Sequence, residues 1–402
     1  MTRSALLSFL LAFASSAAQA ADVPGQRFSV SVASLPKPFA TPAVDNTSDV
    51  VPRPPGALPR APEGFAVSAF ANVPDARWMT VAPNGDVFLA VPDAGKVVVL
   101  RPAADGARAA RISTYASGFA QPHGLAIRNG SLYVADVKSI WRLPYADGAL
   151  KGSGKRVHIA DTTPAQGVGH FTRDIIFDSK GNLFLTIGSK DNLAEDPVPY
   201  ASVEKVNPNG TLSTFASGLR NPVGIAFYPG TDDLYVTVNE RDGLGDNLPP
   251  DYLTRIRQGD FFGWPYAYTG AHPDPTFGAK RPDLVAKTKT PDVLFQAHSA
   301  PLGLVFYDGN QFPVEYKGDA FVALHGSWNS ARPTGYKVVR VHFTNGQPEN
   351  AYQNFVTGWW DGSTSPARVW GRPVGLVVAK DGSLLIADDK SGTVWRVSYK
   401  GK

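Results

Sequence analysis

The chain has 402 residues, of which 43% are hydrophobic and 18% are charged, so a mainly disordered chain is excluded. With 39 glycines and 34 prolines against 2 methionines, the composition favours many short strands joined by tight turns, and we expect an all-β fold. The formal net charge is only +4, which argues against a nucleic-acid-binding protein, and the absence of cysteine excludes disulfides, thiolate metal sites and c-type haem.

The first 20 residues have the pattern of a secretory signal peptide. Arg3 precedes an apolar stretch from Ala5 to Ala14, and small residues follow up to Ala20, after which cleavage is predicted. The apolar stretch is about half of the ~20 residues that a membrane-spanning helix needs, and no later segment is long and apolar enough to cross a bilayer. We therefore expect a periplasmic or secreted protein without a membrane span.

Residues 21–62 form a proline-rich leader ahead of the main domain, which spans residues 63–402. Eight prolines lie between Pro36 and Pro62. Because proline has no backbone N–H, this part cannot sustain a helix or a sheet ladder. We expect an extended segment that lies on the domain or before it.

One pattern recurs six times from Arg77 onward: an apolar strand, a turn that usually contains glycine, and a second apolar strand, with a third strand in several copies. Apolar alternation on both sides of such turns indicates hairpins, and regular spacing near 50 residues is typical of β-propellers. We predict a six-bladed β-propeller. The six copies begin at Trp78, Gly124, Asp174, Gly224, Gly303 and Gly375, with intervals of 46, 50, 50, 79 and 72 residues.

The two long intervals contain insertions. Loops of this length lie on the surface and often carry function. Two of them, Tyr266 to Pro291 and Gly346 to Arg368, are expected to decide substrate choice. The other two are Asn239 to Asp251 and Ser327 to Thr334.

Polar residues recur where the chain leads into the first strand of each blade. Because successive strands are antiparallel, these loops and the loops that leave the second strands lie on the same face. The positions three and four residues before the repeat glycine hold Gln121/Ala120, Phe171/His170, Asn221/Arg220, Ala300/Ser299 and Arg372/Gly371, with Ala76 in the first copy. A mouth with several cations and a histidine base is a default ligand site, and we expect a small polyanionic ligand.

Each of these residues also has a simpler explanation. Arg220 and Arg372 could pair with neighbouring carboxylates, and His170 could be a structural histidine. The loop with Glu240 and Asp242 supplies hard oxygens that suit Ca²⁺, but it lacks EF-hand spacing and could be a solvated polar loop. Four tryptophans could pack between blades or stack on a ligand: Trp264, Trp328, Trp359 and Trp360.

Several longer motifs accompany these residues: GHFTRDIIFDSKGNLFLTIGSKDN (169–192), SGLRNPVGIAF (217–227), VNERDGLGDNLPPDYLTRI (238–256), FFGWPYAY (261–268), HSAPLGLVFYDG (298–309) and ALHGSWNSARPTGYKVVRV (323–339). Together they resemble the sorbosone dehydrogenase branch of the soluble pyrroloquinoline quinone (PQQ) sugar dehydrogenases. The resemblance covers roughly residues 61–399.

The resemblance implies a PQQ-dependent dehydrogenase on a six-bladed propeller, with Ca²⁺ holding the quinone. By position, His170 matches the catalytic base, and Arg220 with Asn221 matches the pair that contacts the cofactor. Arg372 matches an arginine that binds a cofactor carboxylate. Lys190, Arg332 and Gln121 are further candidates for cofactor contact, and the backbone carbonyls of Arg241 and Asp242 stand where the family binds Ca²⁺.

The expected reaction is oxidation of a sugar, a sorbosone-like sugar aldehyde or an alcohol by hydride transfer to PQQ. Since a chain without cysteine cannot carry a c-type haem, electrons are expected to leave to an external acceptor, which could be a periplasmic cytochrome, a quinone or a dye.

Two other functions remain open from the sequence. One is a Ca²⁺-dependent lactonase of the gluconolactonase type, which would use carboxylate and asparagine ligands from several blades and would not need a cluster of arginines. The other is a non-enzymatic propeller that binds a peptide or glycan.

Overall fold

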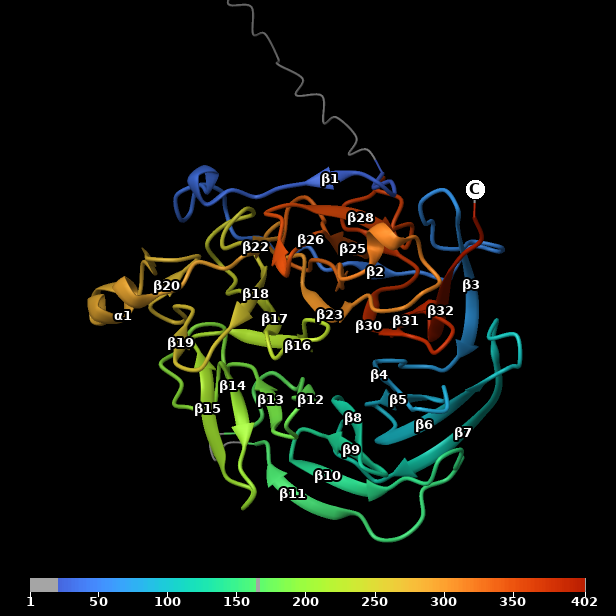
Figure 1. Cartoon of the computed structure of the whole chain (residues 1–402). Coiled ribbons are helices and arrows are strands. Elements are labelled where there is room, and N and C mark those ends of the chain that lie inside the picture. The colour runs from blue at the N-terminus through green and yellow to red at the C-terminus, as the bar shows by residue number, and fades with distance from the viewer. Residues whose placement is uncertain (1–20, 164–166, 402) are drawn as a thin grey trace, which may run out of the picture.

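The computed structural model describes residues 21–163 and 167–401, and the predicted signal peptide lies outside these residues. Six β-sheets surround a central axis as blades (Figure 1), which confirms the predicted six-bladed propeller. Apart from one short parallel strand in the third blade, the strands of each blade are antiparallel, with the first strand nearest the centre. Within the described residues the one α-helix is α1 (Pro282–Lys287), and no helix there has the length and hydropathy needed to cross a membrane.

Three blades come from the first half of the repeat region. The first contains β4 (Trp78–Val81), β5 (Val87–Val91), β6 (Lys96–Pro102) and β7 (Ala109–Ser117). The second contains β8 (Leu125–Arg128), β9 (Ser131–Ala135), β10 (Ser139–Pro144) and β11 (Val157–Asp161). The third contains β12 (Ile175–Phe177), β13 (Leu183–Ile187), β14 (Ser202–Val206), β15 (Leu212–Ser217) and the short parallel strand β19 (Asp260–Phe261).

The other three blades come from the second half of the repeat region, and the fifth and the sixth each add one strand from the N-terminal part of the chain. The fourth contains β16 (Asn221–Phe227), β17 (Leu234–Asn239), β18 (Tyr252–Ile256) and β22 (Val293–Leu294). The fifth contains β23 (Pro301–Phe306), β24 (Ala320–Leu324), β25 (Lys337–Val341), β28 (Tyr352–Val356) and β1 (Arg27–Phe28). The sixth contains β30 (Pro373–Val378), β31 (Leu384–Asp388), β32 (Thr393–Tyr399) and β3 (Phe65–Asn72).

Short elements decorate the loops between these strands. Two hairpins lie in the long insertions: β20 (Ala267–Tyr268) pairs with β21 (His272–Pro273), and β26 (Phe343–Thr344) pairs with β27 (Gln347–Pro348). β2 (Asp49–Val50) pairs with β29 (Arg368–Val369), and the 3-10 turns are η1 (Val32–Ser34), η2 (Gly278–Lys280) and η3 (Val314–Tyr316).

Apolar side chains fill the space between neighbouring blades. Between the sixth and first blades, Phe70, Met79 and Leu385 are buried in one cluster, and comparable clusters lie at the other joints. Full burial of one such side chain contributes about 1.5–3 kcal/mol. The core is therefore a ring of inter-blade layers around the channel.

The glycine of the repeat marks the closest approach between inner strands. A Cβ on Gly124, Gly224 or Gly303 would collide with a backbone carbonyl of the next blade, which belongs to Arg173, Leu302 and Val374 respectively. Only a residue without a side chain lets the inner strands come this close. Blade packing thus explains why the pattern restarts with glycine.

The ring is closed by strand β3, which comes before the first repeat. β3 pairs with β32 along most of its length, from Phe65 opposite Tyr399 to Asn72 opposite Thr393. Figure 1 shows the N-terminal strand beside the C-terminal one. The last blade is therefore assembled from both ends of the chain without a covalent link.

The leader lies on the propeller as an extended segment. Arg27 and Phe28 extend the fifth blade, and Asp22 forms an ion pair of 3.0 Å with Lys337, whose side chain is only 2% exposed. Contrary to the expectation from its prolines, the leader does join sheets, through the two-residue strand β2 and a bridge from Arg60 to Thr357. Asp49, Val50 and Arg60 are not prolines, so their N–H groups remain available for pairing.

Candidate functional site

A pocket of about 580 Å³ opens on the face where the inner strands begin. Its walls come from five of the six blades and from the leader. His170, Arg220, Asn221 and Arg372 all line it, so the structure brings together four of the residues predicted from the sequence.

The ring of His170 is oriented by a fixed hydrogen bond. Its Nδ1 lies 2.6 Å from the backbone oxygen of Ser189, which can only accept. Nδ1 therefore carries the hydrogen, and Nε2 keeps a free lone pair. Burial and the positive charge of Arg220 lower the pKa of His170 to about 4, so the imidazole is neutral at neutral pH.

Glycine at position 188 is needed to hold this arrangement. A Cβ there would collide with Asn221 Oδ1 on one side and with the His170 side chain on the other. β13 ends at Ile187, so Gly188 and Ser189 form the loop that both separates these two side chains and orients the histidine.

Arg220 is buried and held by three protein groups. It donates to the carbonyl of Glu240 at 2.8 Å and to that of Asn192 at 3.3 Å, and it forms an ion pair of 3.3 Å with Asp242. Next to it, Asn221 is 8% exposed and its Oδ1 has no hydrogen-bond partner. An unpaired buried amide oxygen in a pocket wall suggests a ligand group that would satisfy it.

Arg372 lies in the loop that leads into the sixth blade. Its guanidinium donates to the carbonyls of His325 at 2.8 Å and Gly326 at 2.6 Å. Burial lowers the pKa of Arg372, which nevertheless stays charged at neutral pH. A guanidinium has five N–H donors, so Arg372 still has donors to offer to a ligand.

Sequence reasoning missed a third arginine, Arg77. It donates to Asp389 at 2.7 Å, and its buried Nε has no partner. The sequence analysis placed Ala76 at the entry of the first blade because the repeat pattern is weakest in the first copy. The residue that lines the pocket there is the next one, Arg77. The basic residue directly before Trp78 is the signal that could have identified it.

Asp389 also contacts a second histidine of the pocket. Its Oδ1 lies 3.0 Å from Nε2 of His325, while its other oxygen binds Arg77. Although burial alone would raise the pKa of Asp389, the hydrogen bond from His325 and the charge of Arg77 hold it below its usual value, so the carboxylate accepts and Nε2 of His325 carries the hydrogen. Burial and the charge of Arg372 lower the pKa of His325 to about 3, which keeps this ring neutral as well.

Acidic groups lie on the opposite side of the pocket from Asp389. Glu240 and Asp251 are 4% and 3% exposed, and burial raises the pKa of both, that of Glu240 to about 8. Glu240 Oε1 has no hydrogen-bond partner. Within residues 21–163 and 167–401, no group of three or more histidine, aspartate or glutamate side chains is arranged to hold a metal ion.

The carbonyl groups expected to bind Ca²⁺ do not form a ready site. The backbone oxygen of Asp242 accepts from Asn192 Nδ2 at 3.2 Å and from Arg241 Nε at 3.1 Å. The Arg241 side chain turns to Asp274, with an ion pair of 2.5 Å, and does not line the pocket. The Asp242 carbonyl, one of the two that the resemblance assigns to Ca²⁺, therefore already accepts from two protein donors.

Three other predicted contacts also lie elsewhere. Gln121 and Lys190 are exposed and are not part of the pocket wall. Arg332 lines a separate cavity, also of about 580 Å³, together with Thr41 and Asp246. The repeat places the backbone of these loops at the right level, but it does not determine the direction of long exposed side chains.

The insertions and tryptophans are distributed differently from the expectation. Residues 266–291 and 346–368 are not part of the wall of the pocket, so the prediction that they shape the substrate site stays a prediction. Trp264, Trp359 and Trp360 are buried in the packing between elements. Trp328, which is 47% exposed, lines the pocket.

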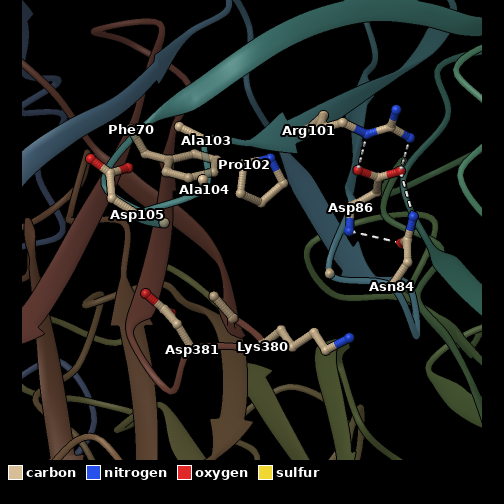
Figure 2. Close-up of a pocket in the computed structure, with 13 residues that line it drawn as sticks. Phe70, Asn84, Asp86, Arg101, Pro102, Ala103, Ala104, Asp105, Lys380 and Asp381 are labelled. Atoms are coloured by element: carbon tan, nitrogen blue, oxygen red, sulfur yellow. Dashed lines mark hydrogen bonds and ion pairs between the residues drawn. The ribbon is translucent and has the colours of Figure 1, made fainter.

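Another cavity, of about 450 Å³, lies at the turns on the opposite face (Figure 2). Arg101 and Asp86 are paired with each other at 2.7 Å in its wall, and Asp381 is paired with Arg396 at 2.6 Å. Asp86, Arg101 and Asp381 of this cavity thus already have partners, whereas Arg77, Asn221 and Glu240 of the channel mouth each keep a buried side-chain atom without one.

The fold and the mouth together define a class of protein: six-bladed propellers with a polar, cationic pocket at one end of the channel. Residues 274–400 match the family model described as TrAA12-like. An uncharacterized protein of Borreliella burgdorferi is 31% identical over 357 residues, which cover 85% of this chain and 91% of that protein. The chain therefore belongs to the same family as that protein.

Relatives with a described function are PQQ-dependent sugar dehydrogenases. The pyrroloquinoline quinone-dependent pyranose dehydrogenase of Coprinopsis cinerea is 28% identical over 342 residues, which cover 68% of this chain and 45% of that protein. This chain thus spans about half the length of that relative. The holo form of the PQQ domain of a Coprinopsis cinerea pyranose dehydrogenase has the same fold, with a TM-score of 0.71, 20% identity, and coverage of 88% of this chain and 100% of the domain.

Proposed function

We propose that the protein is a PQQ-dependent dehydrogenase, an oxidoreductase that oxidises a sugar, a sugar aldehyde of the sorbosone type or an alcohol. The observation that supports this most strongly is the convergence of three arginines, the buried Arg77 and Arg220 and the half-buried Arg372, on one pocket. PQQ carries three carboxylates, and guanidinium groups bind carboxylates well. The described relatives have the same activity in their names.

The donor set fits such a ligand. The three guanidiniums retain N–H groups that no protein acceptor uses, including the buried Nε of Arg77. In contrast, a lactonase that holds its metal with several carboxylates would need a cluster of acidic ligands, and the described residues contain no such group. The pocket thus favours an anionic organic cofactor over a side-chain metal site.

PQQ, when bound, supplies an ortho-quinone that accepts a hydride. The role of the chain is to handle the proton. His170 presents the lone pair of Nε2, and its other nitrogen is fixed on the Ser189 carbonyl, so it can take the proton of the substrate hydroxyl as general base. Carboxylates bound near Arg220 would offset that positive charge and raise the pKa of His170 towards the range in which a base works best.

We include Ca²⁺ as a proposed requirement, without assigning ligands to it. The unpaired oxygens of Glu240 and Asn221 are the oxygens of this pocket that remain available to a hard cation. The proposal also keeps an external electron acceptor and a periplasmic or secreted location, both of which follow from the sequence.

The test is reconstitution of protein made without PQQ. Reduction of an electron-accepting dye is measured with aldoses, alditols and sorbosone after addition of PQQ alone, of Ca²⁺ alone, and of both. We expect dye reduction only when PQQ is present. Adding a Ca²⁺ chelator to the protein loaded with PQQ, and measuring the dye reduction that remains, tests whether Ca²⁺ is required. His170→Gln should still bind PQQ, followed by its absorbance, and should lose turnover by about 10²–10⁴-fold.

Two results would contradict the proposal. If PQQ does not bind, the cationic pocket serves another ligand, and lactone hydrolysis measured without dye then separates a lactonase from a binding propeller. If His170→Gln binds PQQ and turns over normally, the base is another group.

A further inference from the structure

The leader crosses the mouth of the pocket. Its residues 39–51, here called the rim segment, contact the exit loops of two blades and the loop before a third. Phe39 N–H donates to Leu244 O at 2.8 Å, Asn46 N–H to Trp328 O at 2.7 Å, and Asp49 N–H to Ala367 O at 2.8 Å. Leu244 follows the fourth blade's second strand, Trp328 the fifth's, and Ala367 precedes the sixth.

Close packing fixes the rim segment on these loops. Thr41 Oγ1 accepts from the N–H of Asp246 at 2.8 Å, and a Cβ on Gly245 would collide with Thr41. Asn46 Nδ2 donates to the carbonyl of Ser330 at 2.7 Å and to Ser365 Oγ at 3.0 Å. Backbone and side-chain bonds on both sides therefore determine where the residue after Asn46 stands.

That residue, Thr47, lines the pocket. It is exposed, and Trp328, which accepts the hydrogen bond from the leader, is 47% exposed, whereas Arg77 and Arg220 are buried and Arg372 is half-buried. The arginines thus lie at the closed side of the pocket and Thr47 at the open side. A polyanionic cofactor held by the arginines would leave Thr47 facing the molecule that enters after it.

The geometry points to the rim segment as the outer wall of the substrate site, with Thr47 as a specificity-determining residue that contacts the bound sugar. This inference rests on the proposed function. Neither of the two insertions lines the pocket, but the second supports the rim segment through Ser365 and Ala367. A wall made by the leader can vary in sequence without disturbing the repeats that build the blades.

The absence of cysteine gives a direct test. Thr47→Cys creates a single thiol in the pocket wall, and Val50→Cys creates one three residues on, at a side chain that is 52% exposed and outside the pocket wall. The rate of labelling by N-ethylmaleimide is measured for both variants with and without a panel of aldoses, alditols and sorbosone, in protein loaded with PQQ and in protein without it.

We expect sugar to slow labelling of Cys at position 47 at least fivefold and to leave position 50 unchanged. The completed adduct at position 47 should raise KM for the sugar at least tenfold, while the affinity for PQQ changes less than twofold. Thr47→Trp, which adds bulk without a label, should raise KM in the same direction.

Equal labelling rates with and without sugar in both forms of the protein, together with an unchanged KM after labelling, would overturn the inference. If instead the proposed function is wrong, PQQ does not bind to the wild-type protein, and this result distinguishes the two cases. In that case protection by the same panel of sugars in the protein without PQQ still decides whether Thr47 belongs to a sugar-binding wall.

Discussion

His170 and His325 both line the pocket, and in both rings a hydrogen bond to a fixed acceptor determines which nitrogen carries the hydrogen. In each ring one nitrogen donates to a fixed acceptor, the Ser189 carbonyl in one case and the Asp389 carboxylate in the other. The second nitrogen of each ring is left as an acceptor, because both rings are neutral. The resemblance of the motifs indicated His170, but it could not reveal the pair of His325 with Asp389, whose partners are 64 residues apart in different blades.

The buried neutral histidines make stability depend on pH. His325 has a pKa of about 3 in the folded protein, against an ordinary value of 6.5, because of burial and the charge of Arg372, with Arg77 acting in the same direction and Asp389 against it. Between these two values the unfolded chain binds a proton that the folded chain does not. The contribution of His325 to stability is therefore present above pH 6.5 and is lost as the pH falls, by about 1.4 kcal/mol per pH unit.

His325→Gln should make the decline in unfolding free energy between pH 6.5 and pH 4 less steep, by on the order of 1 kcal/mol per pH unit. Denaturant unfolding followed by tryptophan fluorescence at several pH values measures the slope. His158→Gln, at a side chain that is 47% exposed, is the matched control. A His325→Gln slope equal to those of the wild-type and control proteins would show that His325 is already protonated in the folded state. The raised pKa of Glu240 changes the unfolding free energy with pH in the opposite direction to His325. Because Glu240 is present in the wild-type protein and in both variants, its contribution to the three slopes is the same and does not affect their differences.

At the scale of elements, the repeated inner strands could be recognised from the sequence because their glycines serve a packing need. The same need makes a prediction for Gly303, whose missing side chain faces the Val374 carbonyl of the sixth blade. Alanine normally stabilises a strand relative to glycine. Here the added methyl group would force the two blades apart, so Gly303→Ala should lower the unfolding free energy by about 2–3 kcal/mol.

The control for this substitution is Gly152→Ala. A Cβ at position 152 would lie 3.1 Å from the Tyr115 carbonyl, a contact that a small shift relieves. Thermal and denaturant unfolding of both variants should show a clearly smaller loss at position 152. If the two losses are equal, close approach of the inner strands does not explain the glycine of the repeat.

The leader and the loops could not be predicted in this way. Their paths depend on contacts between parts of the chain that are far apart in the sequence, such as Asn46 with Ser330 or Lys337 with Asp22. Arg332 was expected at the cofactor because its loop leaves the correct strand, but the path of that loop is fixed by the rim segment. The repeat of apolar residues in the sequence predicts the strands, but it does not predict the direction of long polar side chains in such loops.

For the whole molecule, the ring depends on one seam that no covalent bond closes. β3 pairs with β32, and across the joint between the sixth and first blades Arg77 binds Asp389 with both side chains at most 10% exposed. The signal in the sequence that could have identified this seam is the apolar stretch from Phe65 to Asn72, which lies ahead of the first copy of the repeat.

Because the pocket spans the joint between the sixth and first blades, ligand binding and closure of the ring should be coupled. Phe70→Ala removes a side chain that is 4% exposed in the layer between these blades, and it should lower the unfolding free energy by about 3–5 kcal/mol. In the proposed function, PQQ would bind only to the folded ring, between Arg372 on one side of the joint and Arg77 on the other. At about 100 times its dissociation constant it should therefore restore about 2.7 kcal/mol. Calorimetric unfolding with and without PQQ measures both changes.

We expect the dissociation constant for PQQ to be larger in the Phe70→Ala variant than in the wild-type protein. At the same ratio of PQQ concentration to dissociation constant, PQQ should stabilise both proteins equally. If the Phe70→Ala protein is destabilised but binds PQQ with an unchanged dissociation constant, the prediction is contradicted. The pocket would then keep its shape when the packing between the sixth and first blades is weakened, and the positions of Arg77 and Arg372 would not depend on that packing.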